Sequence, residues 1–186
     1  VSRERVERHY VLQTFLEGTN TVELDGTYDP PRPRMNATKT RAVTLDRNRD
    51  ALLLNLEKRE VVKTLRSDLN TWRRTGFLAS DFSADGRLLV ITSPEGTLLA
   101  DADNGNNLWR IADPGDSVCF APDRRRIARS FFDNIAILDI RDGTVLARPS
   151  VALPVAFRGA PLRNQFVSFV DDNALIVGDS GYPQSK

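Results

Sequence analysis

The chain has 186 residues, of which 40% are hydrophobic and 27% are charged, proportions typical of a folded globular protein. Its 26 basic and 25 acidic residues leave a net charge of +1, so no overall field favours nucleic acid or an anionic membrane. No apolar run approaches the roughly 18 residues that a membrane-spanning helix needs. We therefore expect neither nucleic-acid binding nor membrane insertion.

The N-terminal segment, residues 1–19, admits two interpretations. Its polar start favours a short helix, whereas Tyr10, Leu12 and Leu16 also suit a strand that pairs with Thr21–Leu24. Residues 20–65 are expected to form a first unit, with Thr21–Leu24 as its candidate first strand. The later strands of this unit are expected at Arg41–Leu45, Ala51–Asn55 and Glu60–Leu65.

Two inserted loops accompany the first unit. The proline-rich stretch Asp29–Arg34 is unsuited to a sheet, so we expect an exposed extended loop there. A second loop, residues 66–76, carries Trp72, Arg73 and Arg74. Tryptophan and arginine are enriched at the energetically dominant positions of protein interfaces. These three residues are therefore candidate partner contacts, although Trp72 also suits packing back onto the seam between units.

The clearest signal is an internal repeat with a period of 38 residues. Phe82-Ser83-Ala84-Asp85-Gly86-Arg87 recurs as Phe120-Ala121-Pro122-Asp123-Arg124-Arg125. A fixed period of this size indicates units that bury their apolar faces by stacking on their neighbours. The second unit, 78–111, has expected strands at Leu78–Phe82, Arg87–Thr92, Thr97–Asp101 and Asn106–Ile111. The third unit, 117–148, has them at Ser117–Ala121, Arg126–Phe131, Ile135–Asp139 and Thr144–Arg148.

A fourth, looser unit spans residues 154–186. Val155–Phe157, Gln165–Phe169 and Ala174–Gly178 are its expected first, second and third strands. Four short antiparallel strands joined by tight turns make one blade of a β-propeller, so the predicted fold class is all-β. The expected core residues are Phe82, Leu89, Ile91, Leu99, Phe120, Ile127, Ile137, Phe157, Phe169 and Leu175.

These units resemble the blades of WD-repeat and YVTN-type β-propellers. The family's Phe-Ser-Pro-Asp-Gly turn is matched at residues 82–86, and its Trp-Asp pair is replaced by Ala100-Asp101 and Leu138-Asp139. The family's Gly-His dipeptide is absent, so its histidine-centred hydrogen-bond network has no counterpart here. Residues 96–110 also resemble a docking motif of quinoprotein-like propellers, in which a tryptophan, here Trp109, seals one blade against the next. That motif is structural, and we predict no cofactor.

About three and a half units are recognisable, whereas a closed propeller has four to eight blades. The resemblance implies a segment of a larger ring, most often seven-bladed, whose remaining blades would be partners of this chain. The alternative is a compact four-bladed ring completed by N-terminal residues.

The sequence offers no catalytic or metal-binding constellation. His9 and Cys119 are the single histidine and cysteine, and they lie far apart in the sequence. Cys119 lies in an apolar strand, which predicts an unreactive thiol. Arg124 belongs to the densest basic cluster, 124–126, which suits either a solvated turn or a contact to a partner.

These observations predict a non-catalytic scaffold that mediates protein–protein interaction, because binding residues concentrate on the loops of rigid folds. The alternative function is the propeller portion of an enzyme, either a quinoprotein-like oxidoreductase or a serine peptidase with a gating propeller. A single cysteine excludes an intramolecular disulfide, which suits the cytoplasm without requiring it.

Overall fold

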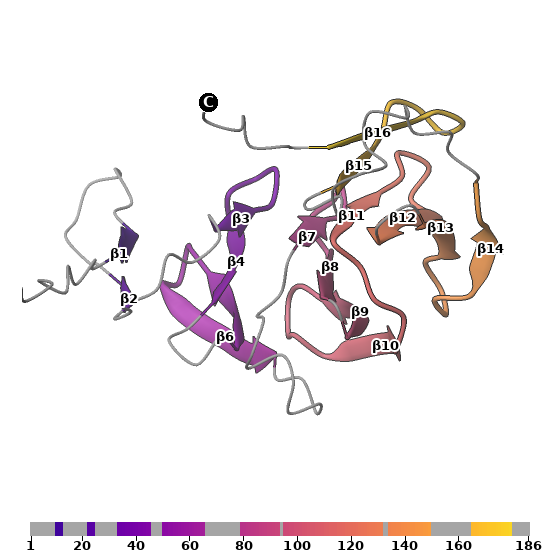
Figure 1. Ribbon diagram of the computed structural model, residues 1–186. Coiled ribbons are helices and arrows are strands. Elements are labelled where there is room, and N and C mark those ends of the chain that lie inside the picture. Colours follow the sequence, from indigo (N-terminus) through magenta and orange to yellow (C-terminus); the bar gives the residue numbers. More distant parts are fainter. Residues whose placement is uncertain are drawn as a thin grey trace, which may run out of the picture.

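The computed structural model describes residues 10–12, 22–24, 33–45, 50–65, 79–93, 95–131, 134–149 and 165–179. Within these ranges all regular elements are antiparallel β-strands, arranged in three four-stranded and two two-stranded sheets. No helix in these ranges is long and apolar enough to cross a membrane. The predicted all-β fold is confirmed, and each four-stranded sheet is one propeller blade (Figure 1).

The blades follow one another along the chain. Blade 1 contains β3 (Arg34–Met35), β4 (Arg41–Leu45), β5 (Ala51–Asn55) and β6 (Glu60–Leu65). Blade 2 contains β7 (Ala79–Phe82), β8 (Leu88–Ser93), β9 (Gly96–Asp101) and β10 (Asn107–Ile111). Blade 3 contains β11 (Ser117–Phe120), β12 (Arg126–Phe131), β13 (Asn134–Asp139) and β14 (Val145–Ala147). The two-stranded sheets are β1 (Tyr10–Leu12) with β2 (Val22–Leu24), and β15 (Gln165–Phe169) with β16 (Leu175–Asp179).

The first strand of each blade lies at the inner edge of an arc. β3 contacts β7, β7 contacts β11, and β11 contacts β15. The sheets extend outward from this row in chain order, so β6, β10 and β14 are the outermost strands. Figure 1 shows the three complete blades following one another around the inner row. The described strands therefore form part of a propeller ring.

One hairpin geometry recurs where the first strand of a blade turns into the second. In each blade, the amide that follows the first strand donates to a carbonyl oxygen at the start of the second strand, at 2.9–3.1 Å. The four donors are equivalent residues spaced by 47, 38 and 49 positions: Asn36, Ser83, Ala121 and Val170. Only the shortest interval repeats visibly in the sequence, because the connections between blades differ in length.

The structure corrects the expected start of blade 1. Its first strand is Arg34–Met35, at the end of the stretch expected to be a loop, and not Thr21–Leu24. Val22–Leu24 pairs with Tyr10–Leu12 instead. Pro33 directly precedes the two-residue strand β3, and proline is tolerated at the start of an edge strand because no ladder hydrogen bond is lost there.

The order of strands in the fourth unit also differs from expectation. The sequence predicts Gln165–Phe169 as a second strand, but β15 contacts β11 and β12 just as β11 contacts β7 and β8. β15 is therefore a first strand and β16 a second strand. The apolar run of β16 ends in Asp179 and so imitates the third strands, which end in Asp101 and Asp139. Val155–Phe157 lies outside the described residues.

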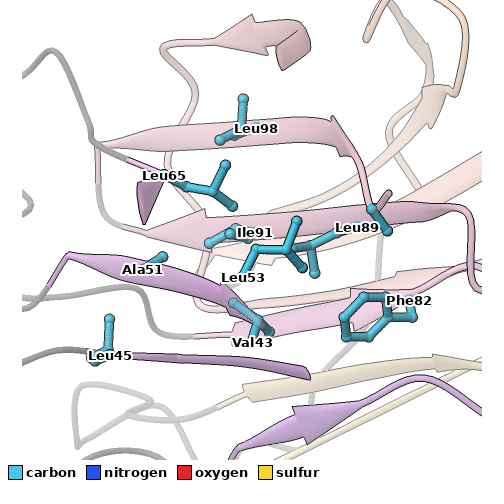
Figure 2. Packing of buried hydrophobic residues seen from close by; sticks show 10 residues of the cluster. Val43, Leu45, Ala51, Leu53, Leu65, Phe82, Leu89, Ile91 and Leu98 are labelled. Atoms are coloured by element: carbon cyan, nitrogen blue, oxygen red, sulfur yellow. The ribbon is translucent and has the colours of Figure 1, made fainter. Parts of the chain in front are cut away.

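The core lies between blades rather than within one sheet. Val43 and Leu53 of blade 1 pack against Phe82, Leu89 and Ile91 of blade 2, as Figure 2 shows. This follows from strand alternation, which sends successive side chains to opposite faces, so each blade buries one face against each neighbour. A second cluster joins blades 2 and 3, and a third joins blade 3 to β15 and β16.

Most of the expected core residues are buried. Phe82, Leu89, Ile91, Leu99, Ile127 and Ile137 are all less than 9% exposed. Phe120, Phe169 and Leu175 pack against these clusters but are only half-buried. Phe157 lies outside the described residues. Phe120 is therefore an edge residue of the core, whereas its repeat equivalent Phe82 is buried.

Candidate functional site

Two of the three hairpins of every complete blade, the one between its first two strands and the one between its last two, lie at the same end of that blade. The hairpin between its first two strands accepts a hydrogen bond, of 2.8 or 2.9 Å, from the hairpin between its last two. The donor amides are those of Leu56, Ala102 and Ile140, and the acceptor carbonyls are those of Thr40, Arg87 and Arg125. We call this end of the blades the hairpin face.

Each hairpin contains one residue in the left-handed backbone region, which favours glycine. Blade 2 uses glycine in both hairpins, with φ of +73° at Gly86 and +71° at Gly105. At three equivalent positions the chain has a cation instead, with φ between +56° and +58°: Lys39, Arg59 and Arg124. This conformation costs a residue with a Cβ roughly 1–2 kcal/mol. The chain thus keeps cations on this face despite a conformational cost.

Two carboxylates of the hairpin face, Asp85 and Asp139, are turned towards their own hairpins. Asp85 accepts the Ser83 hydroxyl at 2.7 Å and the Arg87 amide at 3.1 Å, and these two bonds lower its pKa. Asp139 accepts the Arg141 guanidinium at 2.6 Å and the Arg141 amide at 2.8 Å. These bonds lower the pKa of Asp139 to about 2. Such carboxylates stay ionised and remain tied to the hairpin backbone.

Several cations on the same face are left without such partners. Arg87 and Arg124 come from neighbouring blades, and both act electrostatically on Asp85, so their charges lie close together. Arg126 differs, because its Nε donates to Asp123 at 2.5 Å and its guanidinium lies 5.9 Å from the Phe169 ring centre. The cations that are exposed and have no ion pair with any described residue are Lys39, Lys58, Arg87, Arg124 and Arg125.

The predicted contact residues fall in two different places. Arg124 is exposed at the tip of the first hairpin of blade 3. Trp72, Arg73 and Arg74 belong to the connection between β6 and β7 and lie outside the described residues. The sequence pointed to Arg124 through its cluster of arginines. It gave no sign of Lys39, Lys58 and Arg87, because isolated cations are common in any soluble chain.

A groove of about 500 Å³ runs along the inner strands β7, β11 and β15. Its polar walls include Asp81, Ser117, Cys119 and Ser168. Burial raises the pKa of the Cys119 thiol to about 12. A protonated thiol is a weak nucleophile, which agrees with the unreactive role predicted for this cysteine. The described residues also contain no group of three side chains able to hold a metal ion.

Trp109 connects blades 2 and 3 at their outer edge. Its indole Nε1 donates to the carbonyl oxygen of Ile140 at 2.7 Å, and its ring lies over Gly143, where a Cβ would come within 3.0 Å of it. Lys63 holds the equivalent place between blades 1 and 2, lying against Gly105 and donating to Asn106 at 3.0 Å. The outer strand of one blade therefore seals the last hairpin of the next.

The seam after blade 3 is less well filled. Ala147 takes the place of Trp109 and Lys63 in this blade. A second groove, of about 540 Å³, lies here between β13 and β16. It is walled mainly by apolar side chains, among them Ile135, Ile137, Leu175 and Val177, with Arg126 at its edge. Among the described residues, this seam lacks the side chains that the third and fourth strands of the following blade supply at the other two seams.

Solved structures share this fold. The chain is similar to the β-propeller domain of Cps50 (Swd1) from Myceliophteria thermophila, with a TM-score of 0.60 and 16% identity, over 80% of this chain and 48% of that one. It is also similar to U3-55K, with a TM-score of 0.55 and 10% identity, over 64% of this chain and 38% of that one. The fold is that of WD-repeat β-propellers. The chain spans less than half the length of either structure. No protein-family model and no curated protein matches the sequence.

Proposed function

We propose that this chain is a non-catalytic segment of a larger, seven-bladed propeller and acts as a scaffold for protein–protein interaction. The observation that carries the proposal is the hairpin face, where stacked blades hold exposed cations on hairpins of fixed geometry. Residues placed on a rigid framework bind at a lower entropic cost than residues on mobile segments. Continuous apolar packing from blade to blade supplies that framework.

Two regions are proposed to contact partners. One region is the hairpin face, which includes Arg124. The other is the connection between β6 and β7, which includes Trp72, Arg73 and Arg74. The hairpin face and the blade connections lie at opposite ends of the strands, so these regions would bind independently of each other. A scaffold that joins two partners needs this kind of separation.

Affinity capture with the full-length parent protein tests the scaffold proposal. We expect specific partners that are lost from a Trp72→Ala/Arg73→Ala/Arg74→Ala variant or from an Arg124→Gly variant, while each variant keeps the β-sheet circular dichroism of the wild type. Substitution of an exposed residue outside both regions, Val61→Thr, is the matched control and should lose no partner. Identical partner sets for all four proteins would contradict the proposal.

An enzymatic role is tested separately on the same parent protein. A quinone chromophore, or hydrolysis of peptide substrates that a serine-directed inhibitor blocks, would replace the scaffold assignment. The expected result is that neither is found.

A further inference from the structure

We propose that the hairpin face binds an acidic polypeptide segment through Lys39, Lys58, Arg87, Arg124 and Arg125. This inference rests on the proposed scaffold function and specifies the chemistry of its partner. The five cations are exposed on three consecutive blades and have no ion pair among the described residues. A surface of unpaired cations attracts segments of opposite charge and orients them as they approach.

On this face, the direction in which the charged side chains point matters more than how many there are of each sign. Carboxylates are also present, but Asp85, Asp123 and Asp171 accept amide hydrogen bonds from their own hairpins at 2.7–3.1 Å. Their oxygens therefore point into the turns, whereas long arginine and lysine side chains extend beyond them. At the hairpins of Asp85 and Asp123 a ligand therefore meets cations before carboxylates, even though the whole chain carries a charge of only +1.

The left-handed cations give independent support. Lys39 and Arg124 occupy the position that Gly86 holds in blade 2, and glycine would relieve their backbone conformation. Strained positions that persist in a fold mark functional sites more often than neutral ones do. A cation retained at such a position in two of three blades indicates that the charge itself is used.

An acidic polypeptide fits this arrangement better than a nucleic acid. Arg87 and Arg124 flank the Asp85 carboxylate, and Asp103 and Asp142 are also exposed on the face. These carboxylates would repel an unbroken line of phosphates, which carries a charge at every step. A polypeptide can place glutamate or aspartate side chains beside the guanidinium groups, which bind carboxylates in a two-pronged geometry, and keep neutral backbone elsewhere.

The decisive variant is Arg124→Gly, because binding and stability should change in opposite directions. It removes a cation and also relieves the left-handed backbone, so thermal unfolding should occur at the same or a higher temperature while binding weakens. With a fluorescent ten-residue peptide of alternating glutamate and glycine as probe, we expect about a two- to fivefold rise in Kd, typical of losing one exposed ion pair. The triple variant Arg87→Gln/Arg124→Gly/Arg125→Gln should raise Kd by more than about tenfold.

Control ligands and a control variant separate this proposal from general charge attraction. Arg148→Gln, at the opposite end of blade 3, removes one cation and should leave binding of the glutamate–glycine peptide unchanged. Equal affinity for a ten-nucleotide single-stranded DNA or for phosphatidylserine vesicles would overturn the choice of an acidic polypeptide. So would binding of the glutamate–glycine peptide that the triple variant leaves intact. If partners are captured by the parent protein but are unaffected by the triple variant, the scaffold stands and this inference fails.

Discussion

The carboxylate of Asp81 on β7 accepts the backbone amide of Phe120 on β11 at 3.1 Å. Its other oxygen accepts the guanidinium of Arg34 on β3 at 2.8 Å, so one side chain connects the inner strands of three consecutive blades. The side chain of Asp81 is only 17% exposed, which limits its screening by water. Cys119 holds the equivalent position in the next blade, where its sulfur receives a hydrogen bond from the backbone of Phe169.

Replacing Asp81 should therefore loosen two seams at once. Asp81→Ala is expected to lower the free energy of unfolding by about 1–3 kcal/mol, because the Phe120 amide loses its acceptor and Arg34 loses its partner. Asp81→Asn keeps an oxygen acceptor and removes only the charge, so its loss should be smaller. Urea denaturation followed by tryptophan fluorescence measures both. An Asp81→Ala protein as stable as the wild type would show that the connection contributes nothing.

The contact between Trp109 and Gly143 predicts a coupled pair of substitutions. Trp109→Phe keeps an aromatic ring in the seam but loses the bond to the Ile140 carbonyl, and should cost about 0.5–1.5 kcal/mol. Gly143→Ala should cost more than 1 kcal/mol, since Gly143 has φ of +74° and the new methyl group meets the indole ring. In a Trp109→Ala background only the backbone strain remains, so Gly143→Ala should cost less. Additive losses would contradict the contact.

At Lys39, unlike at Asp81 and Trp109, we expect a substitution to stabilise the fold. Lys39→Gly should raise the free energy of unfolding by up to about 1 kcal/mol, because glycine adopts a φ of +57° without the clash of a Cβ. Ala37→Gly, two residues earlier in the same exposed hairpin, is the matched control and should lower it by about 0.4–1 kcal/mol. If both substitutions destabilise, the left-handed position carries no strain.

Acid should unfold the protein partly through Asp139. Its pKa is lowered to about 2 by the hydrogen bond from the Arg141 guanidinium and by the Arg141 amide, against an ordinary value of 3.8. A depressed folded-state pKa gives a stabilising contribution that is complete above the unfolded pKa and lost as the pH falls to the folded one. We therefore expect stability to decline between pH values of about 4 and 2. Arg141→Gln should make this decline smaller in denaturation series at different pH, because it brings the folded pKa of Asp139 closer to the unfolded one. An unchanged profile would exclude the pair.

The uncovered face of β15 and β16 predicts self-association of the isolated chain. Ile176 is 52% exposed, although its equivalents Val43, Val90 and Ala128 are fully buried under the following blade. Exposed apolar faces of this kind promote association. Sedimentation velocity at concentrations of some tens of micromolar should reveal oligomers that Ile176→Lys dissociates, while Val61→Lys on the outer strand β6 leaves them intact. A compact, stable monomer would favour the closed four-bladed alternative.

Local chemistry explains why blades 2 and 3 were predictable from the sequence. Their hairpins need an aspartate that accepts backbone amides and a residue with positive φ, and Asp101 with Gly105 matches Asp139 with Gly143 in both respects. Blade 1 performs the same tasks with Asn55 and Arg59, which no turn pattern distinguishes from ordinary surface residues. Its first strand has two residues, too few to show a period.

The candidate site was less predictable than the fold. Composition gives nearly equal numbers of acidic and basic residues, and only the structure reveals that carboxylates such as Asp85 are bound to their own turns. Which cations remain unpaired depends on these contacts. Arg124 and Arg126 illustrate the point, since they are two residues apart and one is exposed while the other lies against Asp123.

The unequal intervals of 47, 38 and 49 residues between equivalent hairpins have a consequence for the design of reporters. Most of the added length lies between one blade's last strand and the next blade's first, and these connections leave the blades at the end opposite the hairpins. The connections at one end of the blades therefore differ in length, while the hairpins at the other end share one geometry. A fluorescent label introduced in the longest of these connections, between Ala147 and Gln165, would leave the hairpins free for their ligands.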